Sequence, residues 1–301
     1  MIDFDAVTEL AVEAGHAIME VYNRSGDIDF ETKGDESPLT EADLAANDVI
    51  TKKLVSMTPD IPIVSEEGNL GDPTKSPFCW LVDPLDGTKE FIKKNGMFTV
   101  NIALMRRRGA RWSPVFGVVH APATRTTWSG GTTTPSRRDG PDGNGLIMVS
   151  PSSKDEPTRL VASGTHRGAK DEEFADAVGR HELIRMGSSL KACVVAEGKA
   201  DLYPRFGPTS CWDIAAAHSV VMAAGGAVVG PDGSRRMPLT EFFVGPRKTI
   251  LAPHELLIDV IIPRRNLGKP TNFYKFGLRK GQALALVNAA SSLWVEDLSL
   301  I

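Results

Sequence analysis

Cysteine is scarce in this chain, with three residues among 301. They are Cys79, Cys193 and Cys211, and pairing any two leaves the third alone. Their wide spacing also fails to match the closely paired cysteines of zinc sites. The scarcity therefore excludes a disulfide framework and a cysteine-held metal, and it predicts buried thiols in a reducing cytoplasm.

A strong charge imbalance and a long apolar run are missing as well. The 34 Lys and Arg residues nearly balance the 38 Asp and Glu residues, for a formal net charge of −4. No apolar run reaches the roughly 20 residues of a membrane-spanning helix, and the chain opens on an acidic amphipathic helix rather than a signal sequence. We expect a cytoplasmic protein with a small-molecule partner and no nucleic-acid polymer or membrane span, and leave a homodimer open.

Hydrophobic spacing gives the main elements. Helical spacing predicts one helix over about 3–24 and a second that ends near Met57. Three apolar segments between 98 and 128 predict an antiparallel meander, and strands alternating with helices after 158 predict an α/β layer. The segment Gly130–Asn144 lacks an apolar period and is expected to be a mobile loop between two domains.

The stretch Phe78–Phe91 concentrates polar residues at the end of an apolar run. The run predicts a buried strand that stops at Asp83, because the proline that follows has no N–H to donate to a ladder. Asp86 comes three residues later, and Gly87 permits a tight turn into a short helix beginning at Thr88. Two acids and a helix N-terminus are thus predicted to converge.

Two carboxylates this close raise each other's pKa unless a cation lies between them. Mg²⁺ suits the pair, with Asp83 bridging two ions, the Leu85 carbonyl adding an oxygen, and the amides of Gly87 and Thr88 free for phosphate oxygens. An Asp-rich turn without an ion is the simpler interpretation of the string by itself. A haloacid-dehalogenase nucleophile is excluded, because Pro84 occupies the place that the nucleophilic Asp would need.

Three further acids each have a structural interpretation. Thr40 predicts an N-cap with Asp43 at the third helical position, which forms a capping box. Adjacent side chains on a strand point in opposite directions, so only one of Glu66 and Glu67 can face the acidic pair, and a solvated acidic turn is the alternative. Asp213 comes before a small-residue helix and is interpreted as its N-cap.

Two later turns offer groups for an anion. Ser163 and His166 belong to a turn after a predicted strand, where hydroxyl, imidazole and guanidinium donors can hold a phosphate. Gly187, Ser188 and Lys191 open a predicted helix with free N–H groups and a cation. An ordinary helix cap explains the second turn equally well.

Together these strings resemble the lithium-sensitive, metal-dependent phosphatases of the inositol monophosphatase superfamily, and among them the bacterial 3'(2'),5'-bisphosphate nucleotidases. Asp-Pro-Leu-Asp-Gly-Thr-Lys-Glu-Phe-Ile at 83–92 and Phe-Thr-Val-Asn-Ile-Ala-Leu at 98–104 carry the resemblance, which covers about residues 3–236. It implies a layered αβαβα sandwich of the α+β or α/β class. Residues 1–145 are then a metal-binding domain, 146–236 an α/β domain that completes the pocket, and 237–301 an atypical extension.

The resemblance also implies a role for each candidate. One Mg²⁺ is held by Glu66, Asp83 and the Leu85 carbonyl, and a second by Asp83, Asp86 and Asp213. Thr88, with Asp43 or Glu66, orients the attacking water. The implied substrate contacts are Gly87, Thr88, Lys89, Ser163, His166, Gly187, Ser188, Lys191 and Asp213, although Thr165 departs from the usual serine.

The implied reaction is removal of the 3'-phosphate of adenosine 3',5'-bisphosphate, and also of 3'-phosphoadenosine 5'-phosphosulfate, in sulfur assimilation. Inositol or sugar phosphates are the alternative substrates. Strings at 239–251 and 274–288 are similar to a fragment of the FAD-carrying subunit of molybdenum hydroxylases, without its flavin-pyrophosphate loops. FAD is therefore not implied, and a non-catalytic or flavoprotein-associated fusion protein is the rival interpretation.

Overall fold

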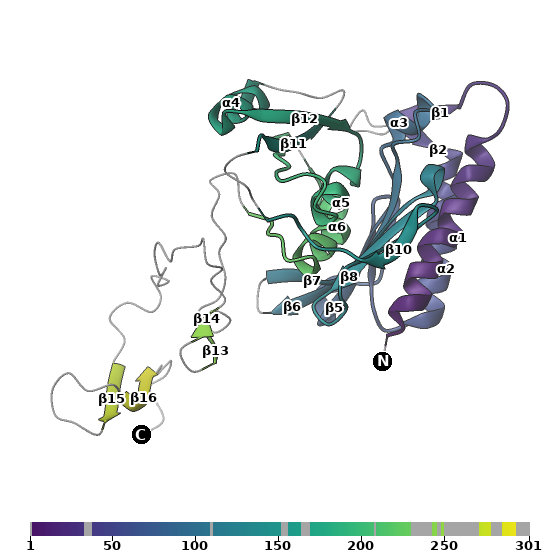
Figure 1. Cartoon of the computed structure of the whole chain (residues 1–301). Coiled ribbons are helices and arrows are strands. Elements are labelled where there is room, and N and C mark those ends of the chain that lie inside the picture. The colour runs from purple at the N-terminus through teal and green to yellow at the C-terminus, as the bar shows by residue number, and fades with distance from the viewer. Residues whose placement is uncertain are drawn as a thin grey trace. The chain divides into compact units, whose positions relative to one another are not determined.

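The computed structural model describes residues 2–32, 38–108, 111–151, 156–163, 169–207 and 209–229, with four strands between 243 and 292. The chain divides into two compact units, Met1–Arg235 and Arg236–Ile301. In the first unit, helices and sheets alternate as a layered αβαβα sandwich (Figure 1), which is the predicted fold class. The expected boundary between residues 145 and 146 stays a prediction.

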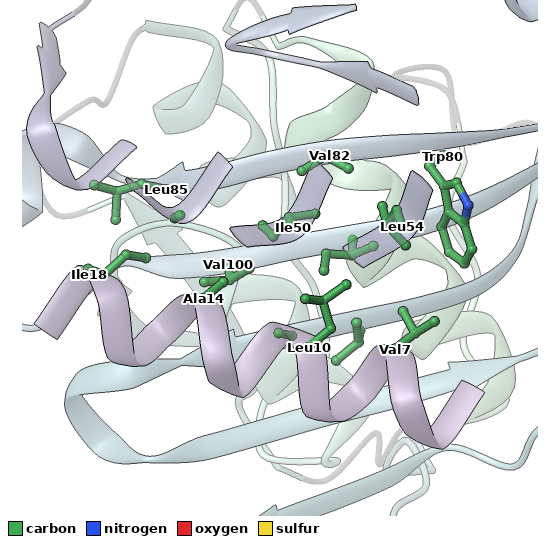
Figure 2. Close-up of a cluster of buried hydrophobic side chains, with 14 of the residues drawn as sticks. Val7, Leu10, Ala14, Ile18, Ile50, Leu54, Trp80, Val82, Leu85 and Val100 are labelled. Carbon is green, nitrogen blue, oxygen red and sulfur yellow. The ribbon is translucent and has the colours of Figure 1, made fainter. Parts of the chain in front are cut away.

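The outer helical layer forms as the apolar spacing predicts. Helix α1 (Phe4–Tyr22) begins at Asp3, whose side chain caps two backbone amides, and helix α2 (Glu41–Met57) begins with the predicted capping box of Thr40 and Asp43. Each fully buried aliphatic side chain on this face stabilises the fold by roughly 1.5–3 kcal/mol. Figure 2 shows the cluster, in which α1 and α2 meet the sheet through Leu10, Ala14, Ile18, Ile50, Leu54, Val82 and Val100.

The central layer is an eight-stranded sheet in the order β10-β9-β8-β7-β6-β5-β3-β4. Its strands are β3 (Ile63–Ser65), β4 (Gly68–Leu70), β5 (Phe78–Asp86), β6 (Thr99–Arg108), β7 (Arg111–Ala121), β8 (Thr126–Gly131), β9 (Arg137–Gly140) and β10 (Gly143–Leu146). All neighbours are antiparallel except β3 and β5, so the predicted meander is confirmed. The small elements beside it are β1 (Phe30–Thr32), β2 (Pro38–Thr40), η1 (Pro73–Lys75), η2 (Pro122–Thr124) and α3 (Thr88–Ile92).

The opposite face of the sheet is covered by α5 (Leu190–Ala196) and α6 (Cys211–Ala223). Because side chains alternate along a strand, β6 sends Ile102 to the α1 side and Ala103 to the α6 side. The approach of α6 is so close that a Cβ added to Gly117 would lie 2.2 Å from the Ala216 carbonyl oxygen. Small residues on both sides of this contact therefore set the position of α6.

The last two layers are a short parallel sheet and an outer helix. Strands β11 (Thr158–Ser163) and β12 (His181–Met186) pair in parallel, and α4 (Ala169–Val178) connects them. Beside β11, the segment at 200–203 contributes one isolated bridge, between Leu160 and Leu202. The predicted α/β alternation is otherwise present.

Four local predictions were wrong. The segment Gly130–Asn144 is not a loop, because β9 and β10 form an exposed hairpin that its backbone ladder and an Arg137–Asp139 ion pair hold without apolar residues. Strand β5 does not stop at Asp83 but continues to Asp86. Of the three thiols expected to be buried, Cys79 and Cys193 are buried and Cys211 is exposed. Helix α6 begins after Ser210, which is the N-cap, so Asp213 occupies the third helical position of a capping box.

The second unit contains two described hairpins. Strands β13 (Phe243–Gly245) and β14 (Lys248–Thr249) are antiparallel, as are β15 (Thr271–Gly277) and β16 (Ala285–Ser292). The resemblance of this region to the molybdenum hydroxylase subunit stays a prediction. Among the described helices of the whole chain, none is long and apolar enough to cross a membrane.

Candidate active site

An irregularity in β5 brings its two acids to one side of the sheet. Asp83 pairs with Asn101 and Asp86 with Thr99, so three steps along β5 oppose two along β6. Residues three apart on a regular strand point to opposite faces, and the extra residue of the bulge returns Asp86 to the side of Asp83. Pro84 lies inside the bulge, where no ladder pair forms, and for that reason it does not end the strand.

Asp83 is the most strongly perturbed acid of the site. Its side chain is 1 % exposed, and burial raises the pKa of its carboxyl well above the ordinary value. The carboxylates of Asp86, Glu66, Asp213 and Asp43 raise that pKa further, in this order. One hydrogen bond, from the Leu85 amide to Oδ1 at 3.2 Å, partly satisfies the group. The five acids predicted from separate parts of the chain are thus close enough to repel one another.

Thr88 lies between Asp43 and the backbone of the bulge. Its hydroxyl is 3.3 Å from Asp43 Oδ1 and 3.2 Å from the Leu85 carbonyl oxygen. The second oxygen of Asp43 accepts the amide and hydroxyl of Thr40 at 2.7 and 2.6 Å. Capping therefore uses one oxygen of Asp43 and leaves the other toward Thr88, so the structural and catalytic interpretations are compatible.

Asp86 and Asp213 each have one oxygen that is held by the protein. Oδ2 of Asp86 accepts the amide of Ser189 at 2.7 Å and its hydroxyl at 2.9 Å, and Oδ2 of Asp213 accepts the Ser210 amide at 2.9 Å. Burial raises the pKa of Asp213 to about 6, the charge of Asp86 adds to it, and the bond from the Ser210 amide opposes it.

The donor set suits a hard divalent cation. Across the described residues, no three His, Cys, Asp or Glu side chains already form a cage for a metal ion. Asp43, Asp86 and Asp213 each accept N–H or O–H hydrogen bonds from the protein at one carboxylate oxygen. Four clustered carboxylates and a carbonyl oxygen are nevertheless the donors that Mg²⁺ prefers, and a cation would relieve their mutual repulsion. The residues therefore fit the ion, and its ligand set stays a prediction.

A cationic and aromatic cluster lies beside the acids. Lys191 is buried, and its Nζ donates to the Ser188 carbonyl at 2.6 Å and lies 5.4 Å from the centre of the Tyr203 ring. Burial lowers the pKa of Lys191, Asp86 opposes this effect, and the guanidinium of Arg205 adds to it. Burial also raises the pKa of the Tyr203 phenol to about 12. This cluster offers two cations and a ring to an anionic, aromatic ligand.

The other predicted residues are placed as follows. The Glu66 amide donates to the Val82 carbonyl at 3.1 Å, which puts Glu66 beside Asp83. Ser188 lies against Gly87, since a Cβ added to Gly87 would be 3.2 Å from the Cβ of Ser188. Ser163 pairs with Met186, directly before Gly187, whereas Lys89 is exposed on α3. His166 lies outside the described residues.

Sequence reasoning left several residues of the site unassigned. Asn101, Ser189, Tyr203 and Arg205 all contact or electrostatically influence the predicted acids or Lys191. Asn101 carried one signal, because a buried amide on an apolar strand requires polar partners. The others depend on contacts between segments far apart in the chain.

Comparisons with known proteins give the family of the chain. The model of the inositol monophosphatase family matches residues 3–266. A 3'(2'),5'-bisphosphate nucleotidase CysQ of Escherichia coli O6:H1 is 45% identical over 226 residues, covering 74% of this chain and 89% of that protein. The CysQ of Haemophilus influenzae is 31% identical over 253 residues, covering 83% of this chain and 90% of that protein.

Solved structures give the same result. The crystal structure of CysQ from Bacteroides thetaiotaomicron, a bacterial member of the inositol monophosphatase family, has a TM-score of 0.60 and 34% identity, and the match covers 72% of this chain and 84% of that one. An IMPase from Thermotoga maritima has a TM-score of 0.63 and 27% identity, covering 75% and 84%. The chain therefore belongs to the inositol monophosphatase family of phosphatases.

Proposed function

We propose that this protein is a Mg²⁺-dependent phosphatase that removes the 3'-phosphate of adenosine 3',5'-bisphosphate, leaving AMP and phosphate. The observation that carries the proposal is the environment of Asp83, a buried carboxylate among four other carboxylates. Such a cluster is stable as a set of anions only with cations among them. When bound, Mg²⁺ supplies charge neutralisation to the phosphoryl oxygens and the leaving oxygen.

The chain's own residues then position the reactants. The Thr88 hydroxyl has one proton, so it donates to either Asp43 or the Leu85 carbonyl and offers a lone pair to a water. Asp43, fixed at its other oxygen by the helix cap, is placed to accept the proton that leaves through Thr88. This pair would orient a water for in-line attack on a phosphoryl group that cations bound by the acids hold in place.

The cluster of Lys191, Tyr203 and Arg205 favours a nucleotide over an inositol phosphate. A bisphosphorylated nucleoside carries a second phosphate and a base, which match two cations and an aromatic ring. An inositol monophosphate carries hydroxyl groups in place of the second phosphate, so it offers no further anionic group to the buried Lys191. The CysQ relatives are 3'(2'),5'-bisphosphate nucleotidases by name, which supports the same substrate class.

The test is a phosphate-release panel with the purified full chain. Substrates are adenosine 3',5'-bisphosphate, 3'-phosphoadenosine 5'-phosphosulfate, an inositol monophosphate and a sugar phosphate, each with Mg²⁺ and with a chelator. We expect the nucleotides to be preferred, no turnover without metal, and a higher KM for nucleotides alone in Lys191→Met. Lys199→Met, at an exposed lysine, is the matched control. A preference for inositol phosphate, or turnover in the chelator, contradicts the proposal.

A further inference from the structure

We infer that Ser189 and Asn101 are positioning residues that fix the orientation of Asp86, so that only one of its oxygens is presented to the ion. The inference rests on the proposed metal-dependent function. Neither residue is part of the ligand or substrate set predicted above, and both reach Asp86 through hydrogen bonds.

Ser189 makes the closest contacts with Asp86. Its amide donates to Oδ2 at 2.7 Å and its hydroxyl lies 2.9 Å from the same oxygen. The hydroxyl is also 2.9 Å from the main-chain carbonyl of Asp213. Ser189, at the start of α5, therefore connects two segments that carry predicted ligands, β5 and α6.

Asn101 fixes the direction of these bonds. Its Nδ2 donates to the Ser189 hydroxyl oxygen at 2.9 Å and lies 3.5 Å from Asp86 Oδ2. A serine hydroxyl has one proton, so with Asn101 as donor to its oxygen, Ser189 must give that proton to Asp86 or to the Asp213 carbonyl. Asn101 is 1 % exposed and Ser189 is 5 % exposed, so water does not substitute for either donor.

The backbone beside Ser189 is held in an uncommon conformation. Ser188 has φ 52°, in the left-handed region that favours glycine, and its hydroxyl is 2.7 Å from that of Thr99 on β6. Thr99 in turn donates to Asn101 Oδ1 at 3.2 Å. Strained residues persist where their surroundings fix them, and here β6 fixes the turn that brings the Ser189 amide to Asp86.

The consequence concerns how Asp86 binds a cation. Its Oδ2 already accepts up to three hydrogen bonds, so Oδ1 is the oxygen left for the ion, in a one-oxygen contact. Groups that orient a metal ligand in this way typically change metal affinity by about 10- to 100-fold when they are removed. A network that only supported the fold would change stability and leave the affinity unaltered.

The experiment measures metal binding without substrate. Mn²⁺, which is paramagnetic, is titrated into the full chain, and the free ion is followed by electron paramagnetic resonance for wild type, Ser189→Ala, Ser189→Thr and Asn101→Leu. The matched control is Ser219→Ala, a serine on α6 that is 3 % exposed and donates to the Gly130 carbonyl at 3.0 Å, on the sheet face away from α1. Thermal midpoints and the Mg²⁺ dependence of phosphate release are measured alongside.

We expect Ser189→Ala and Asn101→Leu to raise the Mn²⁺ dissociation constant by about 10- to 100-fold. Ser189→Thr keeps the hydroxyl group and should bind Mn²⁺ with an affinity close to that of wild type. Ser219→Ala should lower only the thermal midpoint. A folded Ser189→Ala or Asn101→Leu with wild-type Mn²⁺ affinity overturns the inference. Wild-type protein that binds no Mn²⁺ overturns it together with the metal dependence of the proposed function. Weakened Mn²⁺ binding in a protein that hydrolyses no nucleotide supports the positioning role and contradicts only the substrate.

Discussion

His120 makes the stability of the fold sensitive to acid. It lies on β7, is buried, and shares a 2.8 Å hydrogen bond between Nδ1 and Thr127 Oγ1. Burial lowers its pKa from 6.5 to about 4, the charge of His16 adds to the effect, and a bond with the Thr126 backbone opposes it. The change considered is acidification from pH 8 to pH 5, compared between wild type and His120→Gln.

The sign follows from where the proton binds. Between pH 6.5 and 4 the unfolded chain protonates His120 while the folded chain does not, so stability is lost as the pH falls through this window. The free energy of unfolding drops by about 2 kcal/mol at pH 5 and about 3 kcal/mol at pH 4 from this one group. With an unfolding entropy of about 2.1 cal/mol/K per residue over the first unit, the loss at pH 5 lowers the midpoint by about 4 °C.

Thermal melts at pH 8 and pH 5 test the reasoning. Wild type exceeds His120→Gln in stability at pH 8, and this advantage shrinks by about 2 kcal/mol at pH 5, because glutamine does not titrate. Other titrating groups, including the buried His218, are present in both proteins and cancel in the comparison. An advantage that is the same at both pH values refutes the argument.

Four further outcomes are expected. Asp86→Asn lowers kcat by more than about 100-fold with a thermal midpoint close to wild type, since it removes a charge from the site rather than volume from the core, and near-normal turnover at ordinary Mg²⁺ contradicts the ligand assignment. Gly117→Ala destabilises the fold by about 3 kcal/mol or more, because its Cβ would meet the Ala216 carbonyl, whereas Gly145→Ala, with open space around it, leaves the melting curve nearly unchanged. Li⁺ at submillimolar to millimolar concentration inhibits phosphate release while the same concentration of K⁺ does not, because a small hard cation competes for the carboxylates. Truncation after Arg235, where the first unit ends, keeps kcat and changes at most the thermal midpoint; a folded truncation that binds metal without turnover shows instead that the tail contributes to the site.

Local signals in the sequence were sufficient for much of this fold. The capping box of Thr40 and Asp43 lies within one turn of chain, and the helical spacing of α1 depends on its own residues. The turn at Gly87 into α3 was predicted for the same reason, since Gly87 has φ 92° and the turn needs a glycine, whereas the predicted strand end at Asp83 was wrong. Features decided by neighbouring residues are therefore open to sequence reasoning.

Other features depend on partners that the sequence does not place. The hairpin of β9 and β10 has mostly exposed residues, so no apolar period marks it. Ser189 and Asp86 are 103 positions apart in the chain, and the residues next to each of them do not predict the hydrogen bond between them. The site was predicted as a list of acids, while the bonds that orient those acids required the folded chain.

The bulge in β5 has a further consequence for how this site can vary. An Asp-x-Asp pair on a regular strand would also place both carboxylates on one face, but the backbone between them would stay within the ladder. Leu85 lies within the register shift between Asp83 and Asp86, and its carbonyl oxygen is the one that the Thr88 hydroxyl contacts at 3.2 Å. Chain length, and not only side-chain chemistry, thus sets the number of oxygen donors here. Deleting one residue between the two acids would keep both carboxylates and still remove a donor, a loss that no substitution elsewhere on the strand can replace.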